Sequence, residues 1–183
     1  MDSDFDWSQV WANIREALRN PDYEQIHFNC VHRTHLTPRK LNCMRLITDP
    51  LCSLCSMKAS GTFLHMMWNC PPVSQFWSKA SAKLSDLVSV TIPVTIPVLL
   101  LIDLSEVNII KLKKRTVLAG LTAAKKLEAL RWKLPHYLTI GHWALTFLDA
   151  ICLELSTARI NGASEASMDG WRAAADSLKE RMR

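Results

Sequence analysis

Three cysteines and one histidine occur with the spacing C-x2-C-x9-H-x4-C, as Cys52, Cys55, His65 and Cys70. Thiolate sulfur and imidazole nitrogen are the ligands of structural Zn²⁺, which four such groups bind tetrahedrally. A close pair on a tight turn can chelate together, and a second pair on a short helical or turn segment can complete the site. Because no coordination position is left open, we expect this zinc to hold structure rather than to activate water. The alternative is a set of core cysteines beside a surface histidine.

Apolar residues are interleaved with these four ligands: Leu54, Phe63, Met66 and Trp68. We expect these side chains to cover the metal site. For Phe63 and Trp68 the alternative is stacking on the bases of a single-stranded nucleic acid, worth ~1–3 kcal/mol per base. Packing is the favoured interpretation for Trp68, because a ligand follows it closely in the sequence.

A second polar cluster, His32-Arg33-Thr34-His35, lies upstream of the first ligand. The two histidines could ligate a metal, but no further ligand nearby completes a set. The other interpretation is a basic loop that contacts phosphate. Together with a basic segment near residue 114, this cluster gives seven candidate nucleic-acid contacts, namely His32, Arg33, Arg39, Lys40, Lys113, Lys114 and Arg115.

Charge is unevenly distributed along the 183 residues, whose formal net charge is +5. Residues 1–30 are predominantly acidic, whereas in residues 111–133 eight lysines and arginines face a single acid, Glu128. A basic stretch of this kind is either a solvated face or a surface for an anionic partner such as RNA or DNA.

The expected location of the protein decides how its cysteines are interpreted. The acidic N-terminus lacks the apolar region of a signal peptide, and the longest apolar run is interrupted by Pro93 and Pro97, well short of the ~20 residues of a membrane span. We therefore expect an intracellular protein of the nucleus or cytoplasm, neither secreted nor membrane-bound. There, thiols act as ligands or core residues, and Cys30, Cys43 and Cys152, which fall in apolar patterns, are predicted to be buried.

No catalytic motif is present: the sequence contains no G-x-S-x-G elbow, no P-loop and no H-E-x-x-H. Its carboxylates are scattered, without the paired aspartates of a polymerase. We therefore expect neither enzymatic activity nor a small-molecule substrate.

Apolar residues at helical spacing, with caps and prolines at their ends, predict a mostly α-helical fold. Helices are expected over residues 6–20, 21–30, 38–47, 62–69, 72–88, 106–133, 140–159 and 167–182, several of them starting at a cap residue such as Thr37, Ser105 or Ser167. The predicted organisation is a small zinc-stapled helical domain (1–88), an extended proline-containing linker (89–104) and a C-terminal helical subdomain (105–183).

Several of these residues also resemble a known family. They are Phe28 to Leu41 with its His-Arg pair, the Cys52-x2-Cys55 turn, Thr62 to Pro71 with its Thr-x-x-His and Cys-Pro, and Phe76-Trp77. This pattern resembles the reverse-transcriptase zinc-binding domain near the C-terminus of LINE-type non-LTR retrotransposon polyproteins. Residues 118–126 and 153–162 look like the C-terminal tail of vertebrate elements of that type. Gly61 departs from the pattern, because the family usually has glutamate there.

The resemblance implies a detached C-terminal fragment without endonuclease or polymerase. Our leading hypothesis is a non-catalytic zinc-binding accessory module, retrotransposon-derived, that binds RNA or DNA through basic surfaces. Two alternatives remain open at this point. One is a protein-interaction scaffold, in which the helices around Trp143 to Leu155 and around Trp171 present apolar faces to another polypeptide. The other is a non-functional remnant of the polyprotein.

Overall fold

The computed structural model describes residues 6–17, 20–131 and 138–180. Within these residues the chain forms eight α-helices and one π-helical turn, η1, and its only β-type pairing is an isolated bridge between Leu51 and Ser60. The predicted mostly α-helical fold is therefore confirmed. The elements are α1 (Trp7–Ala17), α2 (Pro21–Val31), α3 (Pro38–Cys43), η1 (His65–Asn69), α4 (Pro71–Val88), α5 (Ile96–Leu100), α6 (Lys111–Arg131), α7 (Ile140–Ile160) and α8 (Glu165–Glu180).

Side-chain caps define the starts of several helices. The Asp6 carboxylate accepts hydrogen bonds from the backbone of Ser8 and Gln9 at the start of α1. Asn20 and Thr37 cap α2 and α3 in the same way, and each is followed by a proline at the first helical position. An uncapped helix N-terminus leaves backbone N–H groups without acceptors, so these short polar residues fix where each helix begins.

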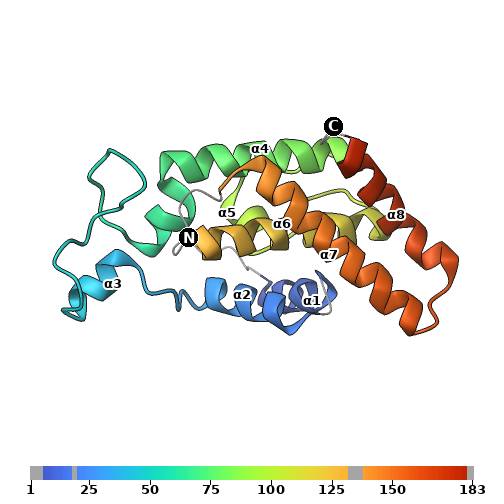
Figure 1. Ribbon diagram of the computed structural model, residues 1–183, viewed down its shortest axis with the longest axis horizontal. Coiled ribbons are helices and arrows are strands. Elements are labelled where there is room, and N and C mark those ends of the chain that lie inside the picture. Colours follow the sequence, from blue (N-terminus) through green and yellow to red (C-terminus); the bar gives the residue numbers. More distant parts are fainter. Residues whose placement is uncertain (1–5, 18–19, 132–137, 181–183) are drawn as a thin grey trace.

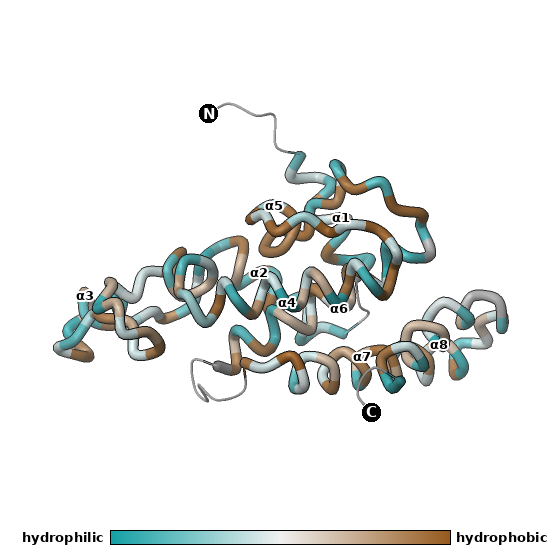
Figure 2. Tube along the Cα trace, turned by 90° about the horizontal axis from the view of Figure 1, so that it is seen from above, coloured by the Kyte–Doolittle hydropathy of each residue, from teal (hydrophilic) through white to brown (hydrophobic). Residues whose placement is uncertain are grey.

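Helix α6 is the centre of the molecule. It contacts α1, α2, α4, α5, α7 and α8, and every residue from 116 to 125 is buried. Figure 2 shows α1 and α5 on one side of α6 and α7 and α8 on the other. A helix that is buried all round needs partners on all its faces, and here helices from both predicted domains supply them.

Gly120 is the point of closest approach between α6 and its neighbours. A Cβ atom at this position would lie 2.5 Å from Leu84 of α4 and 3.1 Å from Phe147 of α7. Its carbonyl oxygen accepts a hydrogen bond of 2.9 Å from the indole of Trp143. The absence of a side chain at Gly120 therefore allows α4 and α7 to pack closely against α6.

The segment between the two predicted domains is not simply extended. Residues Ile96–Leu100 form α5, and Val98, Leu99 and Leu100 are buried in the core. Its prolines exclude sheet, as expected, but Pro97 lies in the first turn of this short helix, where its missing N–H costs nothing. The extended-linker prediction was therefore wrong for these residues, while the domain boundaries themselves stay a prediction.

Three helix boundaries also differ from the sequence prediction. Ser105 does not cap α6: its backbone N–H donates to Asp103 (3.0 Å) in a local turn, and the helix starts at Lys111. Helix α8 begins at Glu165, two residues before the predicted cap. Helix α3 ends at Cys43 and not near Ile47, since Arg45 adopts the left-handed backbone conformation (φ 59°) that terminates a helix.

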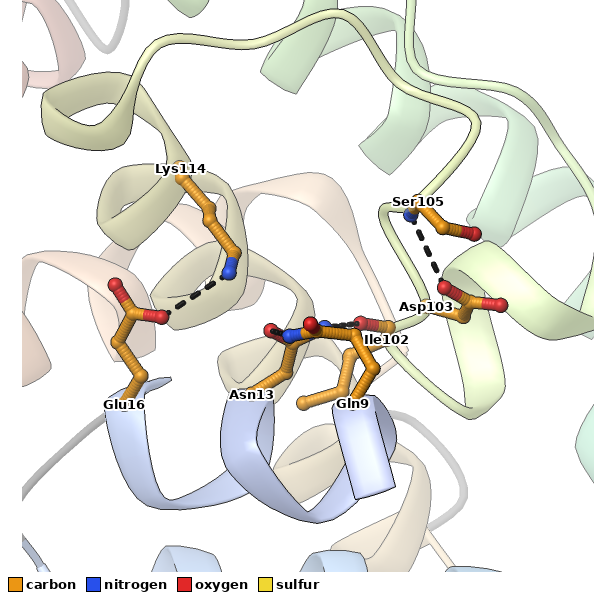
Figure 3. Close-up of polar contacts among 7 residues, drawn as sticks. All are labelled: Gln9, Asn13, Glu16, Ile102, Asp103, Ser105 and Lys114. Atoms are coloured by element: carbon orange, nitrogen blue, oxygen red, sulfur yellow. Dashed lines mark hydrogen bonds and ion pairs between the residues drawn. The ribbon is translucent and has the colours of Figure 1, made fainter. Parts of the chain in front are cut away.

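Two polar contacts attach α1 to the rest of the core (Figure 3). The buried Asn13 donates a hydrogen bond of 2.8 Å to the carbonyl oxygen of Ile102, which follows α5. Glu16 forms an ion pair of 3.1 Å with Lys114 at the start of α6. These contacts join residues 89 and 98 positions apart, so they hold the N-terminal helix against the C-terminal half.

Residues 32–70, named here the Cys–His arm, include α3, the four candidate ligands and η1. Figure 1 shows α3 and the loop after it projecting from one end of the helical bundle. The arm is joined to the bundle through η1, which packs on α4. Among the described residues, no helix is long and apolar enough to cross a membrane.

Candidate metal centre

The four predicted ligands converge in space. The sulfur atoms of Cys52, Cys55 and Cys70 and a ring nitrogen of His65 all lie within 4.8 Å of one another. The Cys52 and Cys70 sulfurs are 3.8 Å apart, and the Cys55 sulfur is 3.4 Å from Nε2 of His65. In a tetrahedral zinc site, bond lengths of about 2.3 Å to sulfur and about 2.0 Å to nitrogen give separations of about 3.8 Å between two sulfur atoms and about 3.5 Å between sulfur and nitrogen. The donor set and its spacing therefore fit a tetrahedral metal ion.

A closed loop brings the first pair of ligands into position. The backbone N–H of Cys52 donates to Ala59 (2.8 Å), and that of Gly61 donates to Pro50 (2.7 Å). Within this loop the backbone N–H of Leu54 points at the Cys52 sulfur, at 3.5 Å. This contact holds the Cys52 side chain inside the loop, on the side where Cys55 lies within 4.8 Å.

The π-helical turn η1 brings the second pair together. The backbone N–H of Cys70 bonds to the carbonyl oxygen of His65, five residues earlier, at 2.8 Å. In an α-helix, residues five apart point in different directions, whereas a π turn closes after five residues and places both on one side. The wider turn is thus the local feature that makes the x4 spacing between His65 and Cys70 suitable for one metal ion.

Apolar residues of η1 and α4 belong to the same buried core as Cys52 and Cys70. Met66 and Met67 are buried, and Trp77 of α4 is fully buried and donates its indole N–H to the carbonyl oxygen of Met67 (3.0 Å). Leu54, Phe63 and Trp68 are partly buried against the core. Three of the four candidate ligands, Cys52, His65 and Cys70, are themselves buried, and the covering of the metal site by the predicted apolar residues stays a prediction.

The thiols differ in their ease of ionisation. Burial, together with the neighbouring Cys52, raises the pKa of Cys70 to about 12. A hydrogen bond from the backbone of Met57 lowers the pKa of Cys55 below its usual value. A divalent cation between these sulfur atoms would offset the cost of a buried thiolate at Cys70, so metal binding would release its proton.

Gly61, the departure from the family pattern, has a packing role that the sequence did not reveal. A Cβ atom there would lie 2.8 Å from both Cβ and Cγ of Pro38, the first residue of α3. The Gly61 carbonyl oxygen also accepts a hydrogen bond from the backbone N–H of Arg39 (3.3 Å). The absence of a side chain at Gly61 therefore allows α3 to pack directly on the loop that carries Cys52 and Cys55, named here the ligand loop.

The candidate nucleic-acid contacts fall into two groups with different surroundings. On the Cys–His arm, Arg33, Arg39 and Lys40 are exposed, and the Lys40 ammonium donates to the carbonyl oxygen of Arg33. At the start of α6, Lys114 pairs with Glu16, and Arg115 pairs with Glu154 (3.5 Å). Lys113 is half-buried.

The upstream histidines do not join the metal site. Among the described residues, the only group of three or more candidate ligands is the Cys52, Cys55, His65 and Cys70 cluster. His32 instead packs beside the rings of Phe28 and Trp11, with centroids 4.3 and 5.8 Å away. His35 packs 5.9 Å from the Phe63 ring, and burial lowers its pKa.

The remaining cysteines are not uniformly buried as predicted. Cys30 is buried, but Cys43 at the end of α3 and Cys152 on α7 are exposed. The prediction for Cys43 and Cys152 was wrong because an apolar helical pattern leaves an outer face, and these two positions lie on it.

Sequence reasoning missed a buried polar chain between α2 and α6. Lys125, counted above within a basic stretch, is 1% exposed and donates to Nδ1 of His27 at 2.8 Å. The Thr122 hydroxyl donates to the carbonyl oxygen of Leu118 (2.7 Å) and accepts from Nε2 of His27 (2.7 Å). His27 is therefore neutral, and burial, followed by the charge of Lys125, lowers its pKa well below the usual value.

Comparisons with known proteins do not extend these assignments. No protein-family model matches the chain, and no curated protein matches its sequence. The fold and the Cys₃His cluster thus define a mostly helical protein with a possible metal site, and the resemblance to the reverse-transcriptase zinc-binding domain stays a prediction.

Proposed function

We propose that this protein is a non-catalytic module whose Cys–His arm, stapled by zinc, binds single-stranded RNA or DNA. The observation that carries the proposal is the charge of the arm. Between Glu24 and Asp86 the only acidic residue is Asp49, against seven lysines and arginines. Those on the arm are all exposed, namely Arg33, Arg39, Lys40, Arg45 and Lys58. Clustered basic side chains without acidic neighbours attract phosphate.

Apolar surface on the same arm supports a nucleic-acid ligand with accessible bases. Seven of the fifteen large hydrophobic side chains that are exposed among the described residues lie on it, namely Leu36, Met44, Leu46, Ile47, Leu51, Met57 and Leu64. Single-stranded nucleic acids combine a charged backbone with apolar base faces, so a surface of mixed basic and apolar residues complements them better than it complements a duplex.

The basic segment at the start of α6 has a smaller part in this proposal. Lys114 and Arg115 are held by Glu16 and Glu154, and the Arg115 guanidinium also lies 5.2 Å from the Trp171 ring centroid. Cations that are already paired gain less from a phosphate. We therefore assign the main phosphate contacts to Arg33, Arg39 and Lys40, with Lys113 as a peripheral one.

The two tryptophans named in the scaffold hypothesis are not available to a partner polypeptide. Trp143 and Trp171 are only 1% and 5% exposed, and both lie in the core formed with α6. The faces around these two tryptophans are thus covered within the chain, whereas Leu145 and Leu153 on α7 remain exposed. The burial of the tryptophans favours the nucleic-acid proposal over this alternative.

A salt series tests the proposed function. The logarithm of the association constant for a single-stranded oligonucleotide should fall linearly with the logarithm of salt concentration, with a slope of about −0.7 for each phosphate contact. The double variant Arg39→Ala, Lys40→Ala should bind more weakly and lose about 1.4 from that slope. Absence of binding at low salt, or a slope unchanged by the double variant, would overturn the proposal.

The chain offers a control with the same change in net charge. Arg159 and Lys179 are exposed and lie near the C-terminal ends of α7 and α8, outside the Cys–His arm. The double variant Arg159→Ala, Lys179→Ala should leave both the affinity and the slope unchanged.

A further inference from the structure

A groove lies beside the metal centre, between α3 and the residues that precede η1. It has a volume of about 400 Å³, and its lining residues are Thr37, Arg39, Lys40, Cys43, Met44, Thr62 and Phe63. This volume lies within the range of sites that hold small molecules or parts of larger ligands. None of the lining residues is acidic.

The groove is lined by both apolar and cationic side chains. Phe63 is half-buried, with its ring beside that of His35, and Met44 is 56% exposed. Arg39 and Lys40 are both exposed and are neighbours on α3. A half-buried aromatic ring and two exposed cations that line one groove match a nucleotide, whose flat base is apolar on its faces and whose phosphate is anionic.

Two features hold the groove in this shape. The Thr37 hydroxyl, itself buried, caps α3 by accepting from the backbone N–H of Lys40 (3.1 Å), and the Thr62 hydroxyl accepts from the backbone N–H of His65 (3.2 Å). Gly61, in contact with Pro38, sets the distance between the two walls. The groove is therefore formed by the same backbone that positions the ligand His65, so metal binding and groove shape are coupled.

From this arrangement we infer that the groove is a base-binding subsite, in which one unpaired base of a single-stranded nucleic acid lies on Phe63 while its flanking phosphates contact Arg39 and Lys40. The inference rests on the proposed function and makes it more specific. A paired base cannot enter the groove, so binding through this subsite discriminates single strands from duplexes.

The thiol of Cys43 provides a direct test, because it is exposed and lines the groove, whereas Cys152, also exposed, lies on α7. The zinc-loaded full-length chain is treated with a thiol-alkylating reagent, with and without oligouridylate, and the modification rates of the two cysteines are measured by peptide mass spectrometry. At an oligonucleotide concentration of about 100 Kd, the Cys43 rate should fall by at least about tenfold, while the Cys152 rate stays constant.

The outcomes separate this inference from the proposed function. If the oligonucleotide binds but Cys43 reacts at its original rate, the subsite is refuted and the proposed function stands. If the same sequence as a duplex, added at the same multiple of its own Kd, protects Cys43 equally, the base-binding role is refuted. If no oligonucleotide binds at low salt, the proposed function is refuted, and the subsite inference is refuted with it.

A pair of variants tests the role of the Phe63 ring in the groove. Phe63→Leu keeps an apolar side chain but removes the stacking surface, so affinity for oligouridylate should fall about fivefold or more. Leu145→Ala removes an apolar side chain that is 49% exposed on α7, outside both the Cys–His arm and the groove, and affinity should stay within about twofold. Zinc content and circular dichroism confirm that Phe63→Leu is folded, and an unchanged affinity in that folded variant contradicts the inference.

Discussion

At the scale of single residues, the most unusual side chain is the buried lysine of α6. Burial lowers the pKa of Lys125 to about 8. Its ammonium lies against His27, and the neighbouring groups with charge or titratable protons are Cys30 on α2 and Glu128 on α6. A buried cation is costly unless its hydrogen bonds are satisfied, and the imidazole acceptor of His27 satisfies one of them. This contact fixes how α2 lies on α6.

The shifted pKa of Lys125 gives a prediction for the pH dependence of stability. Between pH 8 and the ordinary lysine value of 10.5, the unfolded chain binds more protons than the folded chain, so the contribution of Lys125 to the unfolding free energy rises with pH. Relative to Lys125→Met, the wild type should gain about 3 kcal/mol across this window, at 1.36 kcal/mol per pKa unit.

Denaturant unfolding at several pH values from 8 to 10.5 measures this difference, and subtraction removes the contribution of titrating groups that do not interact with Lys125. The control is Lys126→Met, since Lys126 is only half-buried and lies over the Tyr23 ring. A difference between wild type and Lys125→Met that does not change with pH would show that Lys125 titrates normally.

His27 gives a second prediction for the pH dependence of stability, in the acidic range instead of the alkaline range. Because its folded pKa is lowered well below 6.5, the unfolded chain binds more protons below about pH 6.5, and stability falls as the pH decreases through that region. His27→Gln, which can retain a side-chain hydrogen bond but does not titrate, should lose stability less steeply between pH 6.5 and 5. Parallel pH profiles for the two proteins in thermal unfolding would be inconsistent with a buried neutral imidazole.

At the scale of elements, the arrangement of α3 on the ligand loop depends on Gly61. In Gly61→Ala the new Cβ must displace the Pro38 ring, which is rigid, so α3 should shift and stability should fall by about 1–3 kcal/mol. The matched control is Gly141→Ala at the start of α7, where a Cβ would have only Thr139 within 4 Å, at 3.9 Å. Denaturant unfolding of both variants measures the difference; equal effects would mean that the Gly61–Pro38 contact is unimportant.

The elements also show what a sequence can predict. Helix starts at Asn20-Pro21 and Thr37-Pro38 were predictable because capping depends on residues two or three positions apart. The start of α6 was not, because Ser105 resembles a cap but its backbone N–H bonds to Asp103 instead. Likewise, the set of candidate ligands could be predicted from the spacing of the cysteines and the histidine in the sequence. The π turn that orients His65 and Cys70 could not. The burial of Lys125 depends on His27, 98 residues away, and no local pattern signals it.

At the scale of the whole molecule, packing converges on Gly120 of α6. Gly120→Val should lower stability by about 1–3 kcal/mol or more, since Leu84 and Phe147 are both fully buried and have little room to move. The same substitution at Gly141 should have an effect below about 1 kcal/mol. Thermal unfolding of the two variants distinguishes them, and similar melting temperatures would argue against close packing of α4, α6 and α7 at this point.

The bundle and the arm should also respond differently to loss of metal. The loop around Cys52 and Cys55 has few buried apolar residues, so we expect a chelator to increase hydrogen exchange in residues 50–64 strongly. Residues 116–125 of α6, which are buried throughout, should exchange slowly with or without the chelator. Unchanged exchange in residues 50–64 would mean that no metal holds the arm.

The central claim is that Cys52, Cys55, His65 and Cys70 hold one structural zinc ion, and metal analysis of the purified full-length chain tests it most directly. We predict one zinc per chain, lost in both Cys55→Ser and His65→Ala but retained in Cys43→Ser, whose cysteine lies outside the cluster. A wild-type chain that is fully folded, with a protected arm, and contains no metal would contradict the account.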